Sequence, residues 1–295
     1  MMKCGFVTII GKTNVGKSTF LNAFIGKKVS ITSKKSQTTR SNIYAVKTTK
    51  SLQAIFIDTP GIHLRTEKAL NKVLRKKPLE AINDIDVILY MVSGTKFDQV
   101  DQDALNLIKN STAKKILLIN KIDLVADKST LFEFVNNLEE KNLFESIIPI
   151  SAEKQLGLDI VLDELEKALP ENDLFYPPEG FDFQSINFEI SELIREKVIR
   201  FLGDELPYET AIFLENVSDL KSHFEINALI YVAKQSQKKI VIGAEGSKIK
   251  QIGTNARKEL ENHLGRKVNL NLWCKVKKNW LDNSITLESL GIKNL

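Results

Sequence analysis

The 295-residue chain has few of the residues that mark several protein classes. Its two cysteines, Cys4 and Cys274, lie far apart and match no metal-ligand or redox spacing, so we expect a reducing, cytoplasmic setting. Its three histidines show no ligand pattern. No apolar run approaches the roughly 18 residues that span a bilayer. Gly11 and Lys12 also cut short the apolar N-terminal run that a signal peptide would need.

The composition is that of an ordinary globular protein long enough for two domains. Hydrophobic residues make up 43% of the chain and charged residues 27%, with a net charge of +5. The sequence contains no tandem repeat and no low-complexity tract. We therefore expect two domains, each with its own core.

The first part of the chain, to about residue 168, alternates strand-like and helix-like segments. The expected strands are Val7–Ile10, Ile43–Lys47, Ala54–Ile57, Val87–Ser93, Lys115–Ile119 and Ser146–Pro149. The expected helices are Lys17–Ile25, Leu64–Asn83, Asp101–Lys109, Lys128–Lys141 and Leu158–Ala168. Near-continuous apolar strands between helices predict a doubly wound α/β sheet.

A change of pattern follows this alternation. Three prolines and a glycine lie between Leu169 and Gly180, which is typical of a linker. Beyond it we expect a helix at Ser185–Phe201, strands near Thr210–Val217 and Phe224–Val232, an apolar segment at 239–242, a helix at Ser247–Leu264 and a strand at Lys267–Lys275. The predicted organisation is an α/β domain at 1–170, a linker at 171–182 and a smaller α+β domain at 183–295.

The first domain opens with a phosphate-binding pattern. Residues Gly11, Lys12, Thr13, Asn14, Val15, Gly16, Lys17, Ser18 and Thr19 follow a strand and begin a helix. Glycines let the backbone wrap around phosphate oxygens, and the helix N-terminus favours their charge. Lys17 can reach the β- and γ-phosphates, and the Ser18 hydroxyl can ligate Mg²⁺. A chance match in a glycine turn is the alternative, which the flanking strand and helix disfavour.

Two later motifs predict which base is bound. Asn120, Lys121 and Asp123 follow a strand about 100 residues after the phosphate loop. The Asp123 carboxylate can accept hydrogen bonds from the guanine N1–H and N2–H₂ edge, whereas adenine would leave it unpaired. The Lys121 stem can lie over the base. Ser151, Ala152 and Glu153 follow the last strand, where backbone amides can approach guanine O6.

Two further segments are candidates for the metal and the γ-phosphate. Asp58, Thr59, Pro60 and Gly61 close an apolar strand: Asp58 can hold Mg²⁺ through a water, and the Gly61 amide can reach a γ-phosphate oxygen. In the polar loop Ser30–Ser41, a threonine hydroxyl can complete the metal shell, and we favour Thr39 over Thr38. Lys17, Thr39 and Gly61 are thus the candidate catalytic groups. A strand-end turn and a solvated loop are the alternatives for these two segments.

These motifs together resemble the Era family of translation-factor-related GTPases over nearly the whole chain. The resemblance is carried by NVGKST at 14–19, ITSK at 31–34, QTTR at 37–40, DTPGIH at 58–63, NKID at 120–123 and SA at 151–152. Two departures are Lys12-Thr13, where the family has Arg-Pro, and the missing Lys-Pro after His63. The resemblance implies binding to the 3′ end of small-subunit ribosomal RNA, a role in assembly of that subunit, and loose association with the inner membrane. We expect a monomer.

The position that orients water in Ras-like GTPases carries Ile62, whose side chain cannot hydrogen-bond. Backbone groups of the switch loops are one alternative source of positioning. The family resemblance implies another source of charge, a potassium ion held with the help of Asn14. The simpler interpretation of Asn14 is a loop residue that bonds its own backbone.

The second domain contains a G-x-x-G turn, Gly243–Gly246, between helical segments, with Ile249 and Ile252 at helical spacing after it. This pattern resembles a KH domain, which clamps about four nucleotides of single-stranded RNA. The candidate RNA contacts are Gly243, Ala244, Glu245, Gly246, Ser247, Lys248 and Lys250. From Lys234 to Lys278 there are twelve Lys or Arg against three Glu, a balance of +9, which suits a phosphate backbone. Glu245 is the acidic exception in the turn.

Several exposed or aromatic residues remain open to two interpretations. Trp273 and Trp280 flank Lys275, Lys277 and Lys278; they can stack on bases, but we expect Trp273 in the core and Trp280 capping the terminal segment. The basic residues of Leu64–Asn83 form a solvated face or a docking surface. The leading hypothesis is a GTPase switch coupled to an RNA-binding module. The alternatives are a GTPase that docks a protein through its basic domain, and a kinase or ATPase.

Overall fold

The computed structural model describes residues 2–27, 29, 43–58, 85–138, 140–177, 185–202 and 210–277. By their contacts these residues form two compact units: those up to Pro177 belong to the first, and those from Ser185 to the second. The expected helix Leu64–Asn83, the loop Ser30–Ser41, residues 59–61 and Trp280 lie outside the described residues. No helix in the described part is long and apolar enough to cross a membrane.

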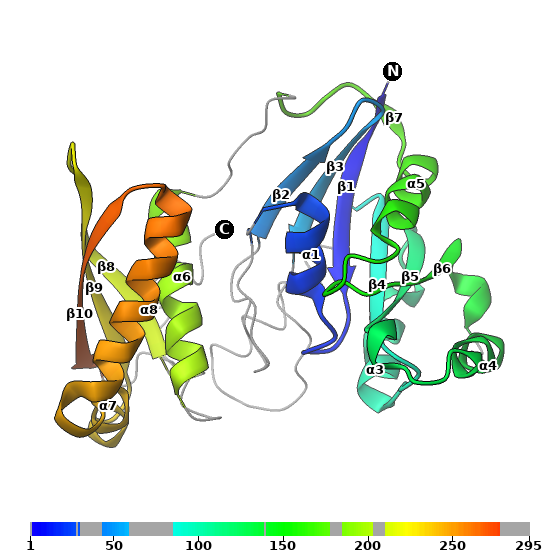
Figure 1. The fold of residues 1–295 in the computed structure, drawn as a ribbon. Coiled ribbons are helices and arrows are strands. Elements are labelled where there is room, and N and C mark those ends of the chain that lie inside the picture. Colours follow the sequence, from blue (N-terminus) through cyan, green and yellow to red (C-terminus); the bar gives the residue numbers. More distant parts are fainter. Residues whose placement is uncertain are drawn as a thin grey trace. The chain divides into compact units, whose positions relative to one another are not determined.

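The first unit is built on one sheet with strand order β2-β3-β1-β4-β5-β6 (Figure 1). Strands β3, β1, β4, β5 and β6 are parallel to their neighbours, whereas β2 is antiparallel to β3. The strands are β1 (Met2–Ile10), β2 (Ile43–Thr48), β3 (Leu52–Asp58), β4 (Val87–Ser93), β5 (Lys114–Asn120), β6 (Ser146–Pro149) and β7 (Glu171–Asn172). The helices are α1 (Lys17–Ile25), α3 (Gln99–Lys109), α4 (Ser129–Asn137) and α5 (Leu158–Ala168), with short 3₁₀ turns at Ile122–Leu124 and Lys141–Leu143.

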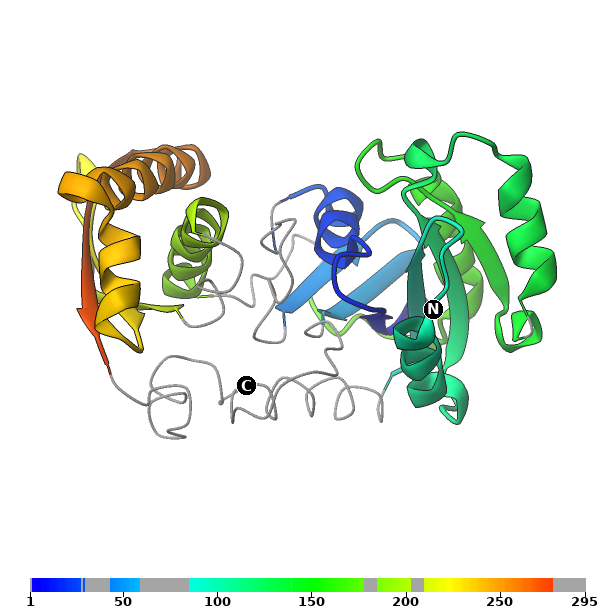
Figure 2. The same ribbon diagram turned by 90° about the horizontal axis from the view of Figure 1, so that it is seen from below.

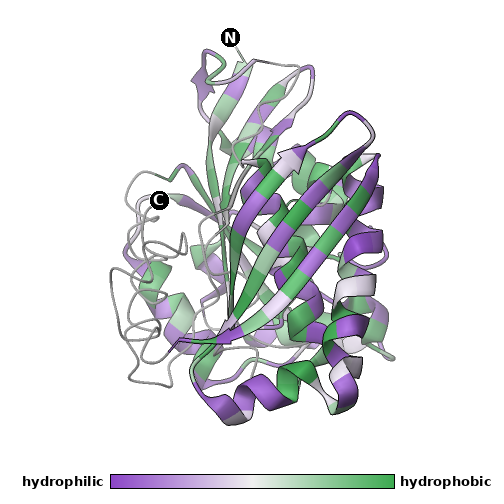
Figure 3. Cartoon of the chain, turned by 90° about the vertical axis from the view of Figure 1, so that its left-hand side faces the viewer, coloured by the Kyte–Doolittle hydropathy of each residue, from purple (hydrophilic) through white to green (hydrophobic). Residues whose placement is uncertain are grey.

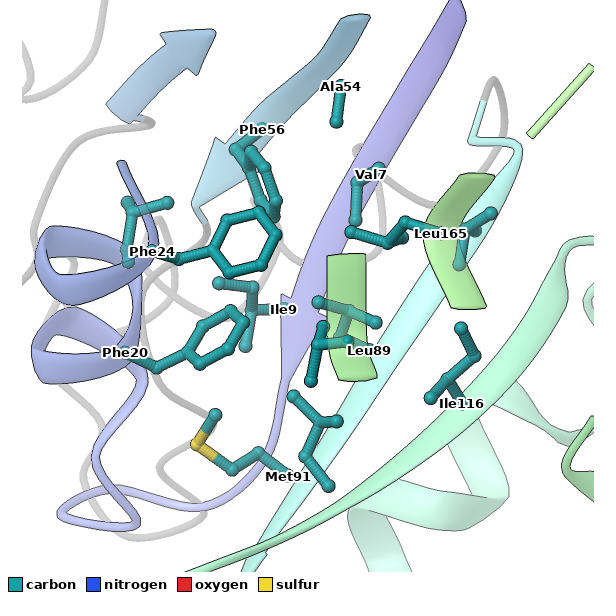
Figure 4. Close-up of a cluster of buried hydrophobic side chains, with 14 of the residues drawn as sticks. Val7, Ile9, Phe20, Phe24, Ala54, Phe56, Leu89, Met91, Ile116 and Leu165 are labelled. Atoms are coloured by element: carbon teal, nitrogen blue, oxygen red, sulfur yellow. The ribbon is translucent and has the colours of Figure 1, made fainter. Parts of the chain in front are cut away.

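Helices cover both faces of this sheet, as Figure 2 shows for α1 and α3 on opposite sides. On one face Val7, Ile9, Phe56 and Leu89 pack with Phe20 and Phe24 of α1 and Leu165 of α5 (Figure 4). On the other face Ile88, Tyr90 and Leu117 pack with Ala104, Leu105 and Ile108 of α3. Because both faces are buried, β4 is apolar along almost its whole length, and the expected doubly wound sheet is confirmed.

The helix expected at Lys128–Lys141 is wrong at its C-terminal end. Helix α4 stops at Asn137, and Leu138 adopts an extended conformation with ψ 112°. That turn places the Leu138 side chain in the core, where it is 7% exposed, and a separate 3₁₀ turn follows at Lys141–Leu143. Burial of one leucine therefore outweighs the helical propensity of the residues after it.

The start of the proline-rich segment is bound to the first unit. Strand β7 pairs antiparallel with Met2 and Lys3 of β1, and the buried Gln53 side chain accepts hydrogen bonds from the amides of Phe175 and Tyr176, both 3.1 Å. Its Nε2 donates to the Tyr176 carbonyl at 2.9 Å. The start of the segment expected as a linker, residues 171–176, is therefore hydrogen-bonded to the first unit.

The second unit is a three-stranded sheet with helices on one face. Its order is β10-β9-β8, with β8 and β9 antiparallel and β9 and β10 parallel. The elements are α6 (Ile186–Phe201), β8 (Thr210–Asp219), β9 (His223–Val232), α7 (Gln235–Ile242), a 3₁₀ turn at Ala244–Gly246, α8 (Ser247–Leu264) and β10 (Lys267–Val276). The apolar segment at 239–242 is the last part of α7.

The core of this unit lies between the helices and the inner face of the sheet. Ile190, Ile194 and Val198 of α6 and Ile252, Ala256 and Leu260 of α8 pack on Ile226, Ala228 and Ile230 of β9. These residues recur at intervals of four along the helices and of two along the strand, so the sequence periodicities match the structure. Figure 3 looks onto the opposite face, where the strands alternate between hydrophobic and hydrophilic residues.

The expectation that Trp273 lies in the core is wrong. Its neighbours Leu272 and Cys274 face the core, so Trp273 points to the outer face of β10, where it is 47% exposed. The alternation of side chains along a strand, and not the size of the residue, decides its side.

Candidate nucleotide and RNA sites

The phosphate loop, residues 11–18, runs from the end of β1 into the first turn of α1. Gly16 adopts φ 106°, a left-handed conformation that favours glycine. A Cβ on Gly16 would overlap the Asn120 side-chain amide, and one on Gly11 would overlap the Met91 carbonyl. Both glycines of the motif are therefore required by close packing of the loop on β4 and β5.

Lys17 is the buried cation of this loop. It is 8% exposed, and its ammonium donates to the carbonyls of Gly11 (2.9 Å) and Lys12 (2.8 Å). Ser18 and Thr19 follow in the same helical turn and are partly exposed, whereas the Val15 side chain is buried in the core. A phosphate in this loop would thus meet backbone amides, the Lys17 ammonium and the Ser18 hydroxyl.

A long-range ion pair anchors the same loop, and the sequence motifs do not reveal it. The Lys12 ammonium lies 2.6 Å from Asp101 Oδ2 and 2.9 Å from Asp98 Oδ2. Asp98 caps α3 and Asp101 is fully buried. Burial by itself lowers the pKa of Lys12. The hydrogen bonds to Asp101 and Asp98 raise it by more, so the pKa of Lys12 is raised overall. The Lys12 hydrogen bond holds the pKa of Asp98 below its usual range, whereas burial raises that of Asp101.

Asn120 joins the phosphate loop to the segment after β6. Its buried side chain donates to the Val15 carbonyl at 2.8 Å and accepts from the Ala152 amide at 2.9 Å. Both ends of the amide are therefore used inside the protein. The structure gives Asn120 the role of a brace between two loops that the sequence analysis placed around one nucleotide.

The remaining guanine-site candidates meet beside this brace. Lys121, at φ 65°, donates to the Asn14 carbonyl at 2.6 Å. Burial lowers the pKa of Lys121, and its proximity to Lys12 adds to the effect while Asp123 opposes it. Asp123 is exposed and accepts a 2.5 Å hydrogen bond from the buried Ser151 hydroxyl. Ser151 fixes the carboxylate, while Glu153 is exposed.

The candidate metal ligands lie at the ends of neighbouring elements. Ser18 is in the first turn of α1, and Asp58 ends β3, paired with Ile9 of β1. Hydroxyl and carboxylate oxygens are ligands that Mg²⁺ accepts, usually with waters and phosphates, so this donor set fits the metal. In the part of the chain that is described, no cluster of three or more His, Cys, Asp or Glu offers an all-protein metal site. Thr39, Thr59, Pro60 and Gly61 lie outside it.

The second candidate site is the clamp loop, Gly243–Gly246, which joins α7 to α8. Gly243 has φ 75° and ψ 177°, Glu245 has φ 50° and Gly246 has φ 76°. A Cβ on Gly243 would lie 2.7 Å from Lys248 Cβ, whereas one on Gly246 would meet nothing within 4 Å. Gly243 is thus required by packing, and Gly246 keeps the surface beside the loop open.

The predicted RNA contacts are brought together at this loop. Ala244, Glu245, Ser247 and Lys250 are exposed, and Lys248 is partly exposed. The turn lies at the N-terminus of the 18-residue helix α8, which favours an anion. Glu245 is the one acidic side chain in this group.

The chain is similar to known proteins along almost its full length. Family profiles described as "50S ribosome-binding GTPase" and "KH domain" match residues 6–121 and 205–281. The GTPase Era of Pseudomonas fluorescens (strain Pf0-1) is 43% identical over 293 residues, which cover 99% of this chain and 98% of that protein. GTPase Era of Glaesserella parasuis is 42% identical over 289 residues, covering 98% and 96%.

Two solved structures are similar over 99% of both chains, each at 33% identity. One is a point variant of Aquifex aeolicus Era bound to GDP·AlF₄⁻, with a TM-score of 0.94. The other is Era in complex with MgGDPNP and nucleotides 1506–1542 of 16S ribosomal RNA, with a TM-score of 0.95. The candidate phosphate loop, the candidate guanine-site loops and the KH-type clamp loop occur together in this one chain. The chain therefore belongs to the Era family of GTPases.

Proposed function

We propose that this GTPase couples its nucleotide cycle to the 3′ end of 16S ribosomal RNA and so acts in assembly of the small ribosomal subunit. The observation that carries the nucleotide part of the proposal is the Asn120 brace, which joins the phosphate loop to Ala152. The same chain bears a clamp loop in which Ala244 and Glu245 are exposed. Support for the RNA comes from the related Era that was solved with nucleotides 1506–1542.

Different residues of the first unit bind the phosphates, the base and the metal ion of GTP. The amides of residues 11–17 and the Lys17 ammonium bind the phosphates, and Asp123 with the Lys121 stem selects guanine. Ser18, Thr39 and Asp58, the last through water, hold Mg²⁺, which when bound neutralises phosphate charge. The Gly61 amide meets the γ-phosphate. The amides of Ser151–Glu153 approach the base. A kinase or ATPase would instead prefer ATP, so competition between GTP and ATP tests this assignment.

Some GTPases use an arginine side chain to supply positive charge at the phosphates. We propose that a potassium ion held near Asn14 supplies this charge here. Asn14 lies in the left-handed region at φ 64°, where alanine is strained and glycine is not. Asn14→Gly therefore removes the side chain while keeping the backbone. We expect hydrolysis to be faster in potassium than in sodium, and Asn14→Gly to abolish that difference. Equal rates in both salts for the parent chain would refute the potassium site.

The clamp loop is proposed to bind single-stranded RNA through Gly243, Ala244, Glu245, Gly246, Ser247, Lys248 and Lys250. Substituting Gly243 would disturb the packing on Lys248, so exposed Ala244 is the better probe. Ala244→Asp adds a negative charge beside the backbone that approaches phosphate, and should weaken RNA binding by tenfold or more. Thr254→Asp adds the same charge to an exposed position of α8 and is the control. Unchanged RNA affinity in Ala244→Asp would favour a domain that docks protein.

The setting of this activity is a further part of the proposal. We propose a cytoplasmic monomer with a loosely membrane-associated fraction. Light scattering of the purified chain tests the monomer, and flotation with vesicles containing anionic lipid tests the membrane association. A stable dimer, or no flotation in low salt, would contradict the respective part.

A further inference from the structure

The outer face of the second unit's sheet carries an ordered arrangement of side chains that the clamp loop does not use. The helices α6, α7 and α8 pack on the inner face, with Ile212, Ile226, Ile230 and Cys274 in the core. The alternate side chains must point to the outer face, which Figure 3 shows toward the viewer.

The strand register arranges these outer side chains in three rows. One row is Asn216, Asn227 and Asn271, the next is Phe213, Leu229 and Trp273, and the third is Ala211, Tyr231 and Lys275. We call these nine residues the platform. Leu229 is 2% exposed at its centre, whereas Trp273 is 47% exposed at its edge. The ring centroids of Phe213 and Tyr231 are 6.1 Å apart.

The groups around Trp273 are those that bind a nucleotide. The Lys277 ammonium lies 5.2 Å from the Tyr231 ring centroid, and Lys275 makes a 3.4 Å ion pair with Glu215. That pair is exposed on both sides, so it contributes little and can exchange for a phosphate. Asn271 donates to Asn227 at 2.9 Å, and side-chain amides offer both donors and acceptors to base edges.

The chemistry favours nucleic acid over a protein partner. An apolar docking patch needs contiguous apolar surface, but on the outer face of β10 the exposed Trp273 lies between Asn271 on one side and Lys275 on the other. An exposed aromatic ring on a sheet, beside lysines, is a common platform for stacked bases. Among the described residues of this face, Lys267, Lys275 and Lys277 outnumber Glu215 and Glu225, which suits a polyanion.

We propose that the platform is a second contact for single-stranded RNA, with a base stacked on Trp273 and phosphates on Lys275 and Lys277. The inference rests on the proposed RNA-binding function and extends it beyond the clamp loop. Strand β10 is at the edge of the sheet, and α7 and α8, which flank the clamp loop, both pack on it. An RNA longer than the clamp can hold would reach Trp273 by rounding this edge.

The test uses the full chain and two RNAs from the 3′ end of 16S ribosomal RNA. The short one has about four nucleotides, enough for a KH clamp, and the long one extends it about threefold. Trp273→Ala should weaken binding of the long RNA by about tenfold and leave the short RNA unchanged. Trp273→Phe should restore most of the affinity. Leu220→Ala, at another exposed apolar residue of this unit, should change neither.

Fluorescence gives an independent readout because the chain has only two tryptophans. In a Trp280→Phe background, the long RNA should quench Trp273 and the short RNA should not. Unchanged affinity for the long RNA in Trp273→Ala, or no quenching at saturation, would overturn the platform. If the short RNA fails to bind even the parent chain, the clamp itself is refuted, so the two failures are distinguishable.

Discussion

At the scale of single residues, the phosphate loop depends on Lys12, which occupies a position where the motif allows any residue. Lys12 joins the loop to buried Asp101, and its carbonyl accepts from Lys17. The side chain at this position therefore fixes the backbone that Lys17 uses.

We expect Lys12→Met to destabilise the protein by about 2–4 kcal/mol, because it strands a buried carboxylate, and to weaken GDP binding. Lys12→Arg should keep both properties. The double change Lys12→Met with Asp101→Asn should recover part of the stability, since no buried charge then lacks a partner. Urea unfolding and GDP titration measure these effects, and a Lys12→Met variant as stable as the parent would contradict the anchor.

Glu245 is expected to weaken RNA binding by the clamp loop. It is exposed in the clamp loop with φ 50°, and its charge repels a phosphate backbone. Glu245→Gln keeps the size and the conformational strain of the residue, so RNA affinity should rise severalfold, more at low salt. The control is Glu133→Gln, an equal charge change on exposed α4 of the first unit. An equal gain in both variants would attribute the effect to net charge alone.

Residue roles could be predicted where the chemistry is local in sequence. The phosphate loop places two glycines, a lysine and a serine within eight residues, so spacing alone indicates the site. The pairing of Lys12 with Asp101 spans 89 residues, and the contact of Asn120 with Val15 spans 105. The local sequence pattern does not indicate such contacts, because they form only when distant segments come together in the fold.

At the scale of elements, Gln53 of β3 ties down the segment after α5. Its fully buried amide bonds the backbone of Phe175 and Tyr176. Gln53→Ala removes the acceptor of the two backbone amides, which are partly buried, and we expect a cost of about 1–3 kcal/mol.

The segment should then detach and become the preferred site of proteolysis between Asp173 and Pro177. Limited digestion followed by mass spectrometry identifies the cut. Gln102→Ala, which removes a side-chain hydrogen bond to Glu140, should leave the pattern unchanged. A digestion pattern in Gln53→Ala identical to that of the parent would contradict the tie.

Elements with a clear apolar pattern were predictable, and those decided by one side chain were not. Helices α1 and α5 and strands β4 and β6 have the bounds expected from the sequence. Helix α4 ends early because Leu138 turns inward, and Trp273 faces outward because its neighbours occupy the core. In both cases tertiary packing overrides the local preference.

At the scale of the whole molecule, each compact unit carries one buried free thiol, Cys4 in β1 and Cys274 in β10. Burial raises the pKa of Cys4, and it raises that of Cys274 to about 11. Both thiols should therefore resist alkylation in the native protein at mildly alkaline pH and react on unfolding.

The sign of the pH dependence follows from these raised pKa values. The neutral thiol of Cys274 favours the folded state fully below its ordinary pKa of 9.0, and this contribution is lost as the pH rises through about 11. GTP should slow labelling of Cys4 more than that of Cys274, because the nucleotide stabilises the first unit. Rapid labelling of either thiol in the native protein would contradict the burial.

We propose the domain limits 1–170, 171–182 and 183–295. The central claim is that the two units act as one switch. The most direct test is GTP hydrolysis in potassium buffer, with and without an RNA that copies the 3′ end of 16S ribosomal RNA. We predict that this RNA accelerates hydrolysis and that a scrambled RNA of equal length does not. Tight RNA binding with no change in the hydrolysis rate would contradict direct coupling and assign it to a further partner.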